Sequence, residues 1–145
     1  VLNTKKDYQF IVKRVNENQT INVQNINTTQ NYITGFYDIE LLTLPRQYFQ
    51  NIRINHNQLT KLQLPSTGLA NILLPAKGFG GVYLKDGDKL TEIYKFNGES
   101  NQYKLTLLPG KYSVVYRAKS SKKYIYTNEK SFIIKSGKSQ LIKIY

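Results

Sequence analysis

The single histidine is the first residue to consider, because histidine is a common general base and metal ligand at neutral pH. His56 stands in the stretch INHNQL, among asparagines. A zinc site or a Ser-His-Asp arrangement needs further groups converging on the imidazole. The sequence offers none in a recognisable spacing, and it contains no cysteine. We therefore predict that His56 is a solvated turn residue, and we expect no catalytic residue, no metal site and no cofactor.

Two aspartates in KDGDKL, Asp86 and Asp88, could be imagined as calcium ligands. Calcium prefers about six to eight oxygen ligands, and here two carboxylates are flanked by Lys85 and Lys89. The Asp-Gly dipeptide is instead typical of a tight hairpin turn. The nine acidic residues of the chain are dispersed, and none forms a recognisable acid/base pair.

The stretch KGFGGVYL carries a Gly-x-Gly-Gly run that superficially resembles a phosphate loop. Such a loop works by feeding the N-terminus of a helix, whereas an alternating strand pattern follows here. We predict a loop or bulge that enters a strand.

Basic residues outnumber acidic residues, 21 against nine, which gives a formal charge of +12. This charge favours acidic partners, but the lysines are scattered over polar positions of alternating segments, where they also protect strand edges. No aromatic signature of a sheet-based RNA reader occurs, so we do not expect nucleic-acid binding.

The best candidate for a partner-binding patch is the stretch KKYIYTNE. Its residues Lys122, Lys123, Tyr124 and Tyr126 combine two cations with two aromatic rings. A protein or a cell-surface glycan is the expected partner, and packing in the core or at a strand edge is the alternative role for the tyrosines.

Alternation of apolar and polar residues dominates the chain, and no window holds a helical stripe. The sequence therefore predicts an all-β fold. No apolar run approaches the roughly 20 residues that span a bilayer. Strands are expected near 8–14, 19–25, 36–43, 48–55, 59–64, 69–74, 80–85, 89–96, 102–108, 111–118, 123–127, 130–135 and 140–145.

Two parts of the chain repeat one pattern. Residues 51–64 align without a gap on residues 131–144, so that Asn57 falls on Gly137 in the turn between two alternating segments. Asn and Gly are the residues most at ease in the left-handed conformation. Further matches pair Ile52 with Phe132, Ile54 with Ile134, Leu62 with Ile142, Leu64 with Ile144, Gly35 with Gly110 and Tyr37 with Tyr112, and residues 9–23 repeat the pattern in part. We predict an internal duplication.

This duplication predicts two small β-sandwich modules, 1–65 and 66–145, with one larger sandwich over 1–145 as the alternative. Tyr37 and Tyr112 are expected to place their rings in the core and their hydroxyls at its rim. Gly110 is expected to bend the chain before its strand, in a conformation that needs positive φ.

The motif Leu-x-Pro-Gly-x-Tyr over residues 107–112, followed by FII, a glycine turn and a last alternating segment, resembles the end of carboxypeptidase-regulatory-like and transthyretin-like sandwich modules. Over roughly residues 30–145 the stretches GFYDIELLTLPRQYF, GLANILLP and GFGGVYL look like the region that follows the von Willebrand factor A domain in secreted Bacteroidetes proteins described as Ca-activated chloride channel family-like.

This resemblance implies a non-catalytic interaction or spacer module of an exported surface or periplasmic protein. The alternatives are a carbohydrate-binding sandwich and a basic nucleic-acid-binding domain. The Asp-x-Ser-x-Ser metal motif of a von Willebrand factor A domain does not occur, so that metal site is not carried over. Because the chain begins with Val1 rather than Met, we expect a mature or excised fragment.

Overall fold

The computed structural model describes residues 8–17, 19–63, 66–118 and 127–144. These residues form strands, turns and loops without a helix, which confirms the all-β prediction. The chain divides into two compact units, Val1–Gln63 and Leu64–Tyr145.

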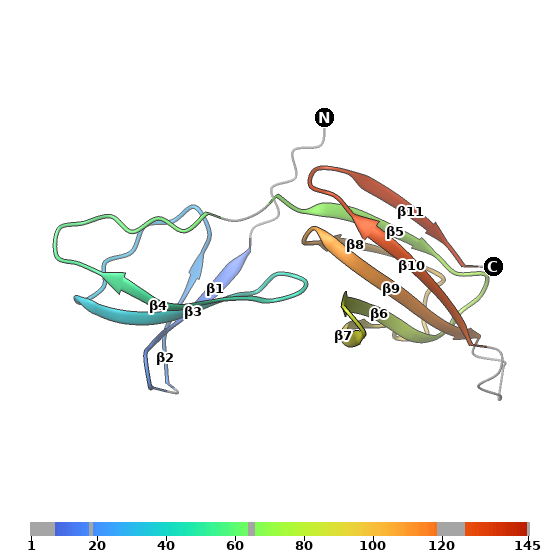
Figure 1. Ribbon diagram of the computed structural model, residues 1–145, viewed down its shortest axis with the longest axis horizontal. Helices are drawn as coiled ribbons and strands as arrows, with labels where there is room; N and C mark the ends of the chain where they lie inside the picture. Colours follow the sequence, from blue (N-terminus) through green and yellow to red (C-terminus); the bar gives the residue numbers. More distant parts are fainter. Residues whose placement is uncertain (1–7, 18, 64–65, 119–126, 145) are drawn as a thin grey trace. The chain divides into compact units, whose positions relative to one another are not determined.

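The first unit contains a four-stranded antiparallel sheet in the order β2-β1-β3-β4 (Figure 1). Its strands are β1 (Gln9–Arg14), β2 (Thr20–Asn25), β3 (Gly35–Leu41) and β4 (Gln47–Ile54).

Alternation along these strands gives the sheet an inner and an outer face. We define the inner face by the buried apolar residues Val12, Tyr37, Ile39 and Leu41. The segment 26–34 covers part of it, because the Tyr32 ring lies 5.5 Å from the Tyr37 ring. The Tyr32 hydroxyl donates a hydrogen bond of 2.7 Å to Gln24 Oε1, which fixes this segment against β2.

The second unit is a β-sandwich of two sheets. One sheet has the order β10-β9-β6-β7 and the other β11-β5-β8, in which β11 runs parallel to β5 (Figure 1). The strands are β5 (Gly68–Leu73), β6 (Gly78–Asp86), β7 (Lys89–Lys95), β8 (Gln102–Leu107), β9 (Gly110–Ala118), β10 (Asn128–Ile134) and β11 (Ser139–Lys143).

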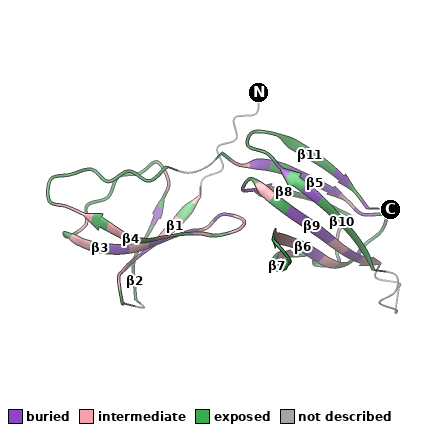
Figure 2. Ribbon diagram, in the orientation of Figure 1, coloured by how far each residue is buried: buried purple, intermediate pink, exposed green. Residues whose placement is uncertain are grey.

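The core of the second unit lies between its two sheets and runs along β5, β8 and β9 (Figure 2). Aromatic rings fill much of it: Phe96 stacks on Tyr103 at 4.5 Å, and Tyr112 stacks on Phe132 at 5.6 Å. Stacked aromatic pairs of this kind add to the free energy gained by burying their area. Tyr112 is fully buried, as the sequence predicts.

The glycine-rich stretch of residues 78–81 forms the first half of β6, directly before a register shift between Val82 and Tyr83. Its glycines permit close backbone approach. A Cβ on Gly80 would lie 1.9 Å from the carbonyl oxygen of Val115, and one on Gly81 would lie 2.2 Å from that of Tyr94. These residues are glycine because neighbouring strands occupy the space of a side chain.

The predicted left-handed turn residues have positive φ. Asn57 has φ 55° and Gly137 has φ 69°, while Gly87 in the Asp-Gly turn has φ 60°. The expectation for Gly110 is wrong, because Gly110 does not have a positive φ. A Cβ there would instead meet the ring of Tyr112 at 3.6 Å, an ordinary contact distance.

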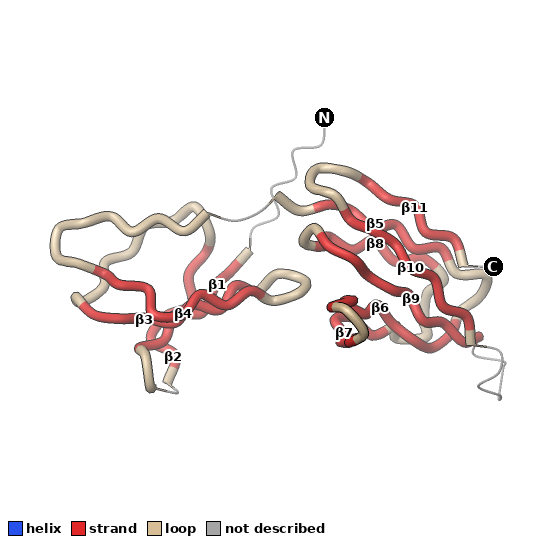
Figure 3. The backbone as a smooth tube through the Cα atoms, viewed as in Figure 1, coloured by secondary structure: helices blue, strands red, loops and turns tan. Residues whose placement is uncertain are grey.

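The predicted strand at 59–64 is not formed in its described part. Residues 55–63 have no strand (Figure 3), although residues 139–143 of the second unit, with the same alternation, form β11. A strand exists only where another strand satisfies its backbone groups, and residues 59–63 have no such partner among the described residues. Most of the expected strand 123–127 lies outside the described residues.

The two four-stranded sheets have the same order of strands along the chain. β2-β1-β3-β4 corresponds to β7-β6-β9-β10. In the third and fourth strands of each set, Tyr37 pairs with Ile52 and Tyr112 with Phe132. Ladders at Gly35 and Ile54, and at Gly110 and Ile134, correspond as well.

Candidate interaction surface

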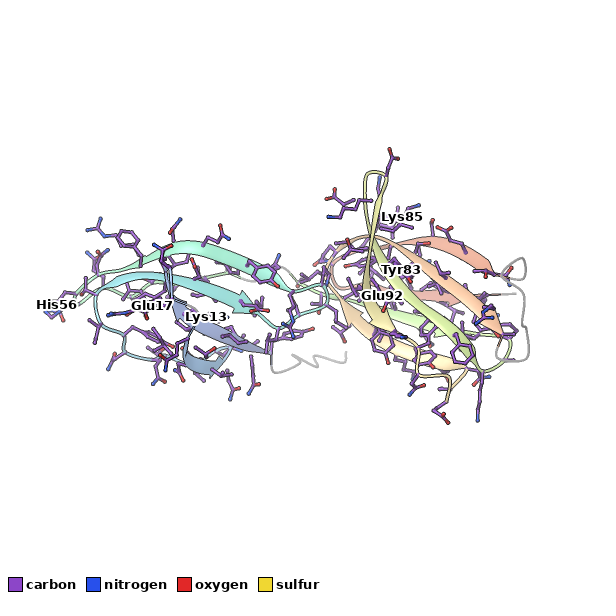
Figure 4. All side chains as sticks on the ribbon, turned by 90° about the horizontal axis from the view of Figure 1, so that it is seen from below. Lys13, Glu17, His56, Tyr83, Lys85 and Glu92 are labelled. Atoms are coloured by element: carbon purple, nitrogen blue, oxygen red, sulfur yellow. The ribbon has the colours of Figure 1, made fainter. Side chains whose placement is uncertain are left out.

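The residues singled out in the sequence fall in different places. Lys122, Lys123, Tyr124 and Tyr126 lie outside the described residues, so the structure places none of them. His56 is exposed in the turn after β4, far from the core (Figure 4).

The described residues were expected to hold no metal, and their acidic and histidine side chains do not gather. No group of three or more His, Asp or Glu side chains that could hold a metal ion occurs in the described part of the chain. Asp86 ends β6 and pairs with Lys89 across the hairpin. Nor does any helix among these residues have the length and apolarity to cross a membrane.

The outer face of the first unit's sheet carries several exposed apolar residues. The ladders place Val23, Ile11, Glu40 and Tyr48 in one row across β2, β1, β3 and β4. Val23 is 51% exposed and Tyr48 is 64% exposed. Val23 and Tyr48 face solvent, whereas Ile11 between them in the row is half-buried.

Phe36 lies on the same face, but the row of Lys13 and Asp38 separates it from the row of Ile11 and Glu40. It lies opposite Arg53 and is 53% exposed. Beside it is a shallow, open depression lined by Arg14, Val15, Asn16, Glu17, Thr34, Gly35, Phe36 and Asn51. We call Ile11, Val23, Phe36 and Tyr48 the outer apolar patch.

A charged cluster lies at one end of the outer apolar patch. Arg46 Nη1 donates a hydrogen bond of 2.6 Å to Glu40 Oε1, and this contact is also an ion pair. The Tyr48 hydroxyl donates to the same oxygen at 3.4 Å. The Glu40 carboxylate therefore holds an arginine and an exposed tyrosine ring side by side.

The remaining charged residues of the outer face are not all paired with an opposite charge. Asp38 Oδ1 accepts a hydrogen bond of 3.1 Å from the backbone N–H of Asn51. No carboxylate among the described residues lies within ion-pair distance of Lys13 or Arg53. Both carboxylates of the outer face are thus engaged by neighbours, while two cations remain available to an acidic partner.

The corresponding face of the second unit carries polar contacts beside the exposed apolar residues Phe79, Leu90 and Ile133. The Tyr83 hydroxyl donates to Glu92 Oε2 at 3.0 Å, and Lys85 Nζ donates to Ser131 Oγ at 3.0 Å (Figure 4 labels Tyr83, Lys85 and Glu92). The hydrogen bond to Glu92 raises the pKa of the Tyr83 hydroxyl above its usual value, and burial and the charge of Glu92 act in the same direction.

The most enclosed contact on this face involves Ser113. Its hydroxyl is fully buried and donates to Glu129 Oε1 at 2.8 Å.

Sequence reasoning missed the outer apolar patch, although a signal for it exists. The run Phe10-Ile11-Val12 is apolar without interruption, so it supplies apolar side chains to both faces of a strand. Such runs are typical of strands covered on both faces.

Comparisons with protein families, with curated proteins and with solved structures found no match for this chain.

Proposed function

We propose that this chain is a non-catalytic interaction and spacer module of an exported, von Willebrand factor A-type surface or periplasmic protein. Its binding surface is the outer apolar patch of the first unit, and its partner is a protein that presents apolar side chains within an acidic surface. The exposure of Val23, Phe36 and Tyr48 on one sheet face supports this proposal most directly.

Burial of the apolar side chains of this patch against a partner would contribute to the free energy of binding. Each Å² of apolar area removed from water contributes about 25 cal/mol, and aromatic residues are enriched where protein interfaces carry most of their binding free energy. Phe36 and Tyr48 are such residues, and each lies beside an arginine from the first unit, Arg53 or Arg46. An aromatic ring beside a guanidinium group suits a protein interface.

The charges of the outer face favour an acidic partner. The outer face carries Lys13, Arg46 and Arg53 against Asp38 and Glu40. The whole chain has a formal charge of +12, which attracts acidic surfaces over distances beyond contact. We therefore expect binding that weakens as salt screens these charges.

The experiment is a screen of immobilised acidic peptides that contain phenylalanine, tyrosine or leucine, against acidic peptides without an apolar residue. The first class should bind, and the substitutions Phe36→Ser and Tyr48→Ser should weaken that binding at least fivefold. The matched control is Ile133→Ser, which removes an exposed apolar side chain from the second unit. Equal loss in all three variants, or binding of neither class, would contradict the proposal.

A second candidate function is carbohydrate binding. It rests on Tyr48, an exposed ring whose neighbours Glu40 and Arg46 offer hydrogen-bonding groups beside it. A glycan array should then show binding that Tyr48→Ser abolishes, without loss in Phe36→Ser. An array without signal would exclude this candidate.

We also propose that the two units arose by duplication of one module. The common strand order and the corresponding ladders at Tyr37 and Tyr112 support this origin. The proposal would fail if residues 35–54 and 110–134 did not superpose in an experimental structure.

A further inference from the structure

The strand β2 lies at one edge of the first unit's sheet (Figure 1). Beyond its last residue, the Ile26 N–H donates a hydrogen bond of 2.9 Å to the Tyr8 carbonyl oxygen, next to the ladder that β2 forms with β1. Hydrogen-bonded and non-hydrogen-bonded pairs alternate along an antiparallel ladder. Gln24, opposite Phe10, therefore bonds to β1, whereas Val23 directs its backbone N–H and carbonyl group away from the sheet.

The edge of β2 is open at Val23. Among the described residues, no strand pairs with β2 on this side, and no hydrogen bond engages the outward backbone groups of Val23. The next outward carbonyl, that of Asn25, accepts a hydrogen bond from the Thr28 hydroxyl. The ladder with β1 skips Ile21, so the regular part of the edge is short. An exposed edge is a template for pairing with another strand.

Charge distinguishes β2 from the other edge strands. Residues 18–37 contain no charged side chain, in a chain with 21 basic and nine acidic residues. Charged side chains, lysine above all, keep the edges of natural sheets from pairing with one another. Each of the other edge strands in the described part of the chain carries at least one charge: Arg53 in β4, Lys89 in β7, Lys104 in β8, Lys130 in β10 and Lys143 in β11. The strand β2 lacks this protection.

The absence of charge also indicates which partner fits this edge. The strand β2 offers an acidic strand no cation of its own. The strand β2 of a second copy matches it better, because no like charges meet along the two strands. The half-exposed Val23 side chain would contact the same side chain of the second copy, and both would lose contact with water.

We propose that the first unit self-associates by antiparallel pairing of β2 with β2 of a second copy, about a two-fold axis at Val23. The Val23 N–H of each copy then donates to the Val23 carbonyl oxygen of the other, which satisfies both outward groups. The two four-stranded sheets become one continuous sheet. A two-fold contact uses the same edge of both copies, so the assembly closes as a dimer.

The strength of this dimer and its response to salt follow from the contact. A single pair of short strands buries less than the roughly 1,200 Å² of a standard stable interface, so we expect a reversible dimer that forms at high protein concentration. The formal charge of +12 makes two copies repel each other at a distance. Salt screens this repulsion and should strengthen the dimer, whereas it should weaken the proposed binding of an acidic partner.

Sedimentation velocity of the 145-residue protein tests the proposal. Increasing protein concentration should convert monomer into dimer, and added salt should lower the dissociation constant. Val23→Lys places two like charges at the two-fold axis and should raise the dissociation constant about tenfold or more. The matched control is Ile133→Lys, which adds the same charge at a half-exposed residue of the edge strand β10 and should leave the dimer unchanged. Urea midpoints report whether both variants are folded.

A crosslinking measurement does not depend on a destabilising substitution. The chain contains no cysteine. In Val23→Cys the two Cα atoms of the dimer should lie about 5.5 Å apart, within the roughly 4.4 to 6.8 Å that a disulfide requires. Under mild oxidation by glutathione, Val23→Cys should form an intermolecular disulfide at least tenfold faster than Ile133→Cys, whose residue is equally exposed.

Several results would overturn the proposal: a monomer at every concentration, a dimer that salt weakens, assemblies larger than a dimer, or equal behaviour of the Val23 and Ile133 variants in either measurement. The self-association is independent of the proposed function. Phe36→Ser and Tyr48→Ser, which test the binding of acidic peptides, should leave the dimer unchanged, because the backbone of β2 forms the contact. Loss of the dimer in both variants would show that the copies meet through the outer apolar patch instead, and the proposed strand pairing would be wrong.

Discussion

The hydroxyl of Tyr112 donates a hydrogen bond to the carbonyl oxygen of Leu108, four residues earlier, where the chain turns into β9. Tyr37 makes the same bond to Ile33 before β3. A tyrosine that bonds back to the backbone at the start of a strand is a tyrosine corner, a feature of many β-sandwiches. In both corners a glycine two residues before the tyrosine lies under its ring. Each Gly-x-Tyr unit therefore stabilises the turn that leads into its strand.

Replacing each corner tyrosine by phenylalanine should destabilise the two units by different amounts. Tyr112→Phe leaves the carbonyl of the buried residue Leu108 without its donor, so we expect a loss of about 1–2 kcal/mol. Tyr37→Phe should cost less, about 0.5 kcal/mol, because Ile33 is exposed and water can replace the hydroxyl. Urea midpoints of the two variants measure this difference. A larger loss for Tyr37→Phe would show that the first corner is the more enclosed one.

Stability should fall at high pH because of Tyr112. Burial raises the pKa of its hydroxyl to about 12, from 10.0. A raised pKa in the folded state means that the neutral form is stabilised, so this contribution is complete below pH 10 and is lost as the pH rises through about 12. The decrease should be smaller in Tyr112→Phe. Denaturant midpoints at pH 9, 10.5 and 11.5 test this, and parallel curves for the two proteins would contradict it.

Gly80 should tolerate substitution far less than Gly110. Gly80 has φ 127°, and an added Cβ would lie 1.9 Å from the Val115 carbonyl oxygen, so Gly80→Ala should cost about 3 kcal/mol or more. Gly110→Ala places its Cβ at 3.6 Å from the Tyr112 ring and should cost less than about 1 kcal/mol. Thermal midpoints of the pair decide the order. If Gly110→Ala were the more damaging, the backbone at Gly110 would be more restricted than its contacts indicate.

The matched turns at Asn57 and Gly137 allow a test of backbone conformation alone. A Cβ at Gly137 would meet no atom within 4 Å, so the cost of Gly137→Ala, about 1 kcal/mol, should come from the positive φ. Asn57→Gly should change the stability of the first unit by less than about 0.5 kcal/mol, since glycine accepts the same conformation. Asn57→Ala is the control and should resemble Gly137→Ala. A large loss of stability in Asn57→Gly would instead show that the asparagine side chain makes a stabilising contact.

Local chemistry explains what the sequence could predict of the fold. Asn57 and Gly137 mark turns because few other residues accept positive φ, and the alternation around Tyr112 predicts a strand with its ring inside. The register between Tyr37 and Ile52 follows from the same alternation, since a shift by one residue would turn the apolar set outward.

The failures concern properties that no local segment determines. Residues 59–63 have the alternation of β11, but a strand also needs a neighbour, and in the second unit this neighbour is β5, distant in sequence. The outer apolar patch was missed because the alternation of polar and apolar residues indicates only which face of a strand points to solvent. It does not show that this solvent face also carries apolar side chains. The expected patch at Tyr124 and Tyr126 lies outside the described residues, so it stays a prediction.

The last prediction separates binding from folding on the two faces of the first sheet. Val23 is half exposed on the outer face, whereas Val12 is buried on the inner face. Replacing valine by threonine keeps the branched shape and adds a hydroxyl, so Val23→Thr should change stability by less than about 0.5 kcal/mol. Val12→Thr buries that hydroxyl and should cost about 1–3 kcal/mol. Denaturant midpoints give both values, and binding of acidic, aromatic peptides by Val23→Thr should weaken without loss of stability. If Val23→Thr destabilised the fold as much as Val12→Thr, the outer face would belong to a second core, and the proposed binding surface would be wrong.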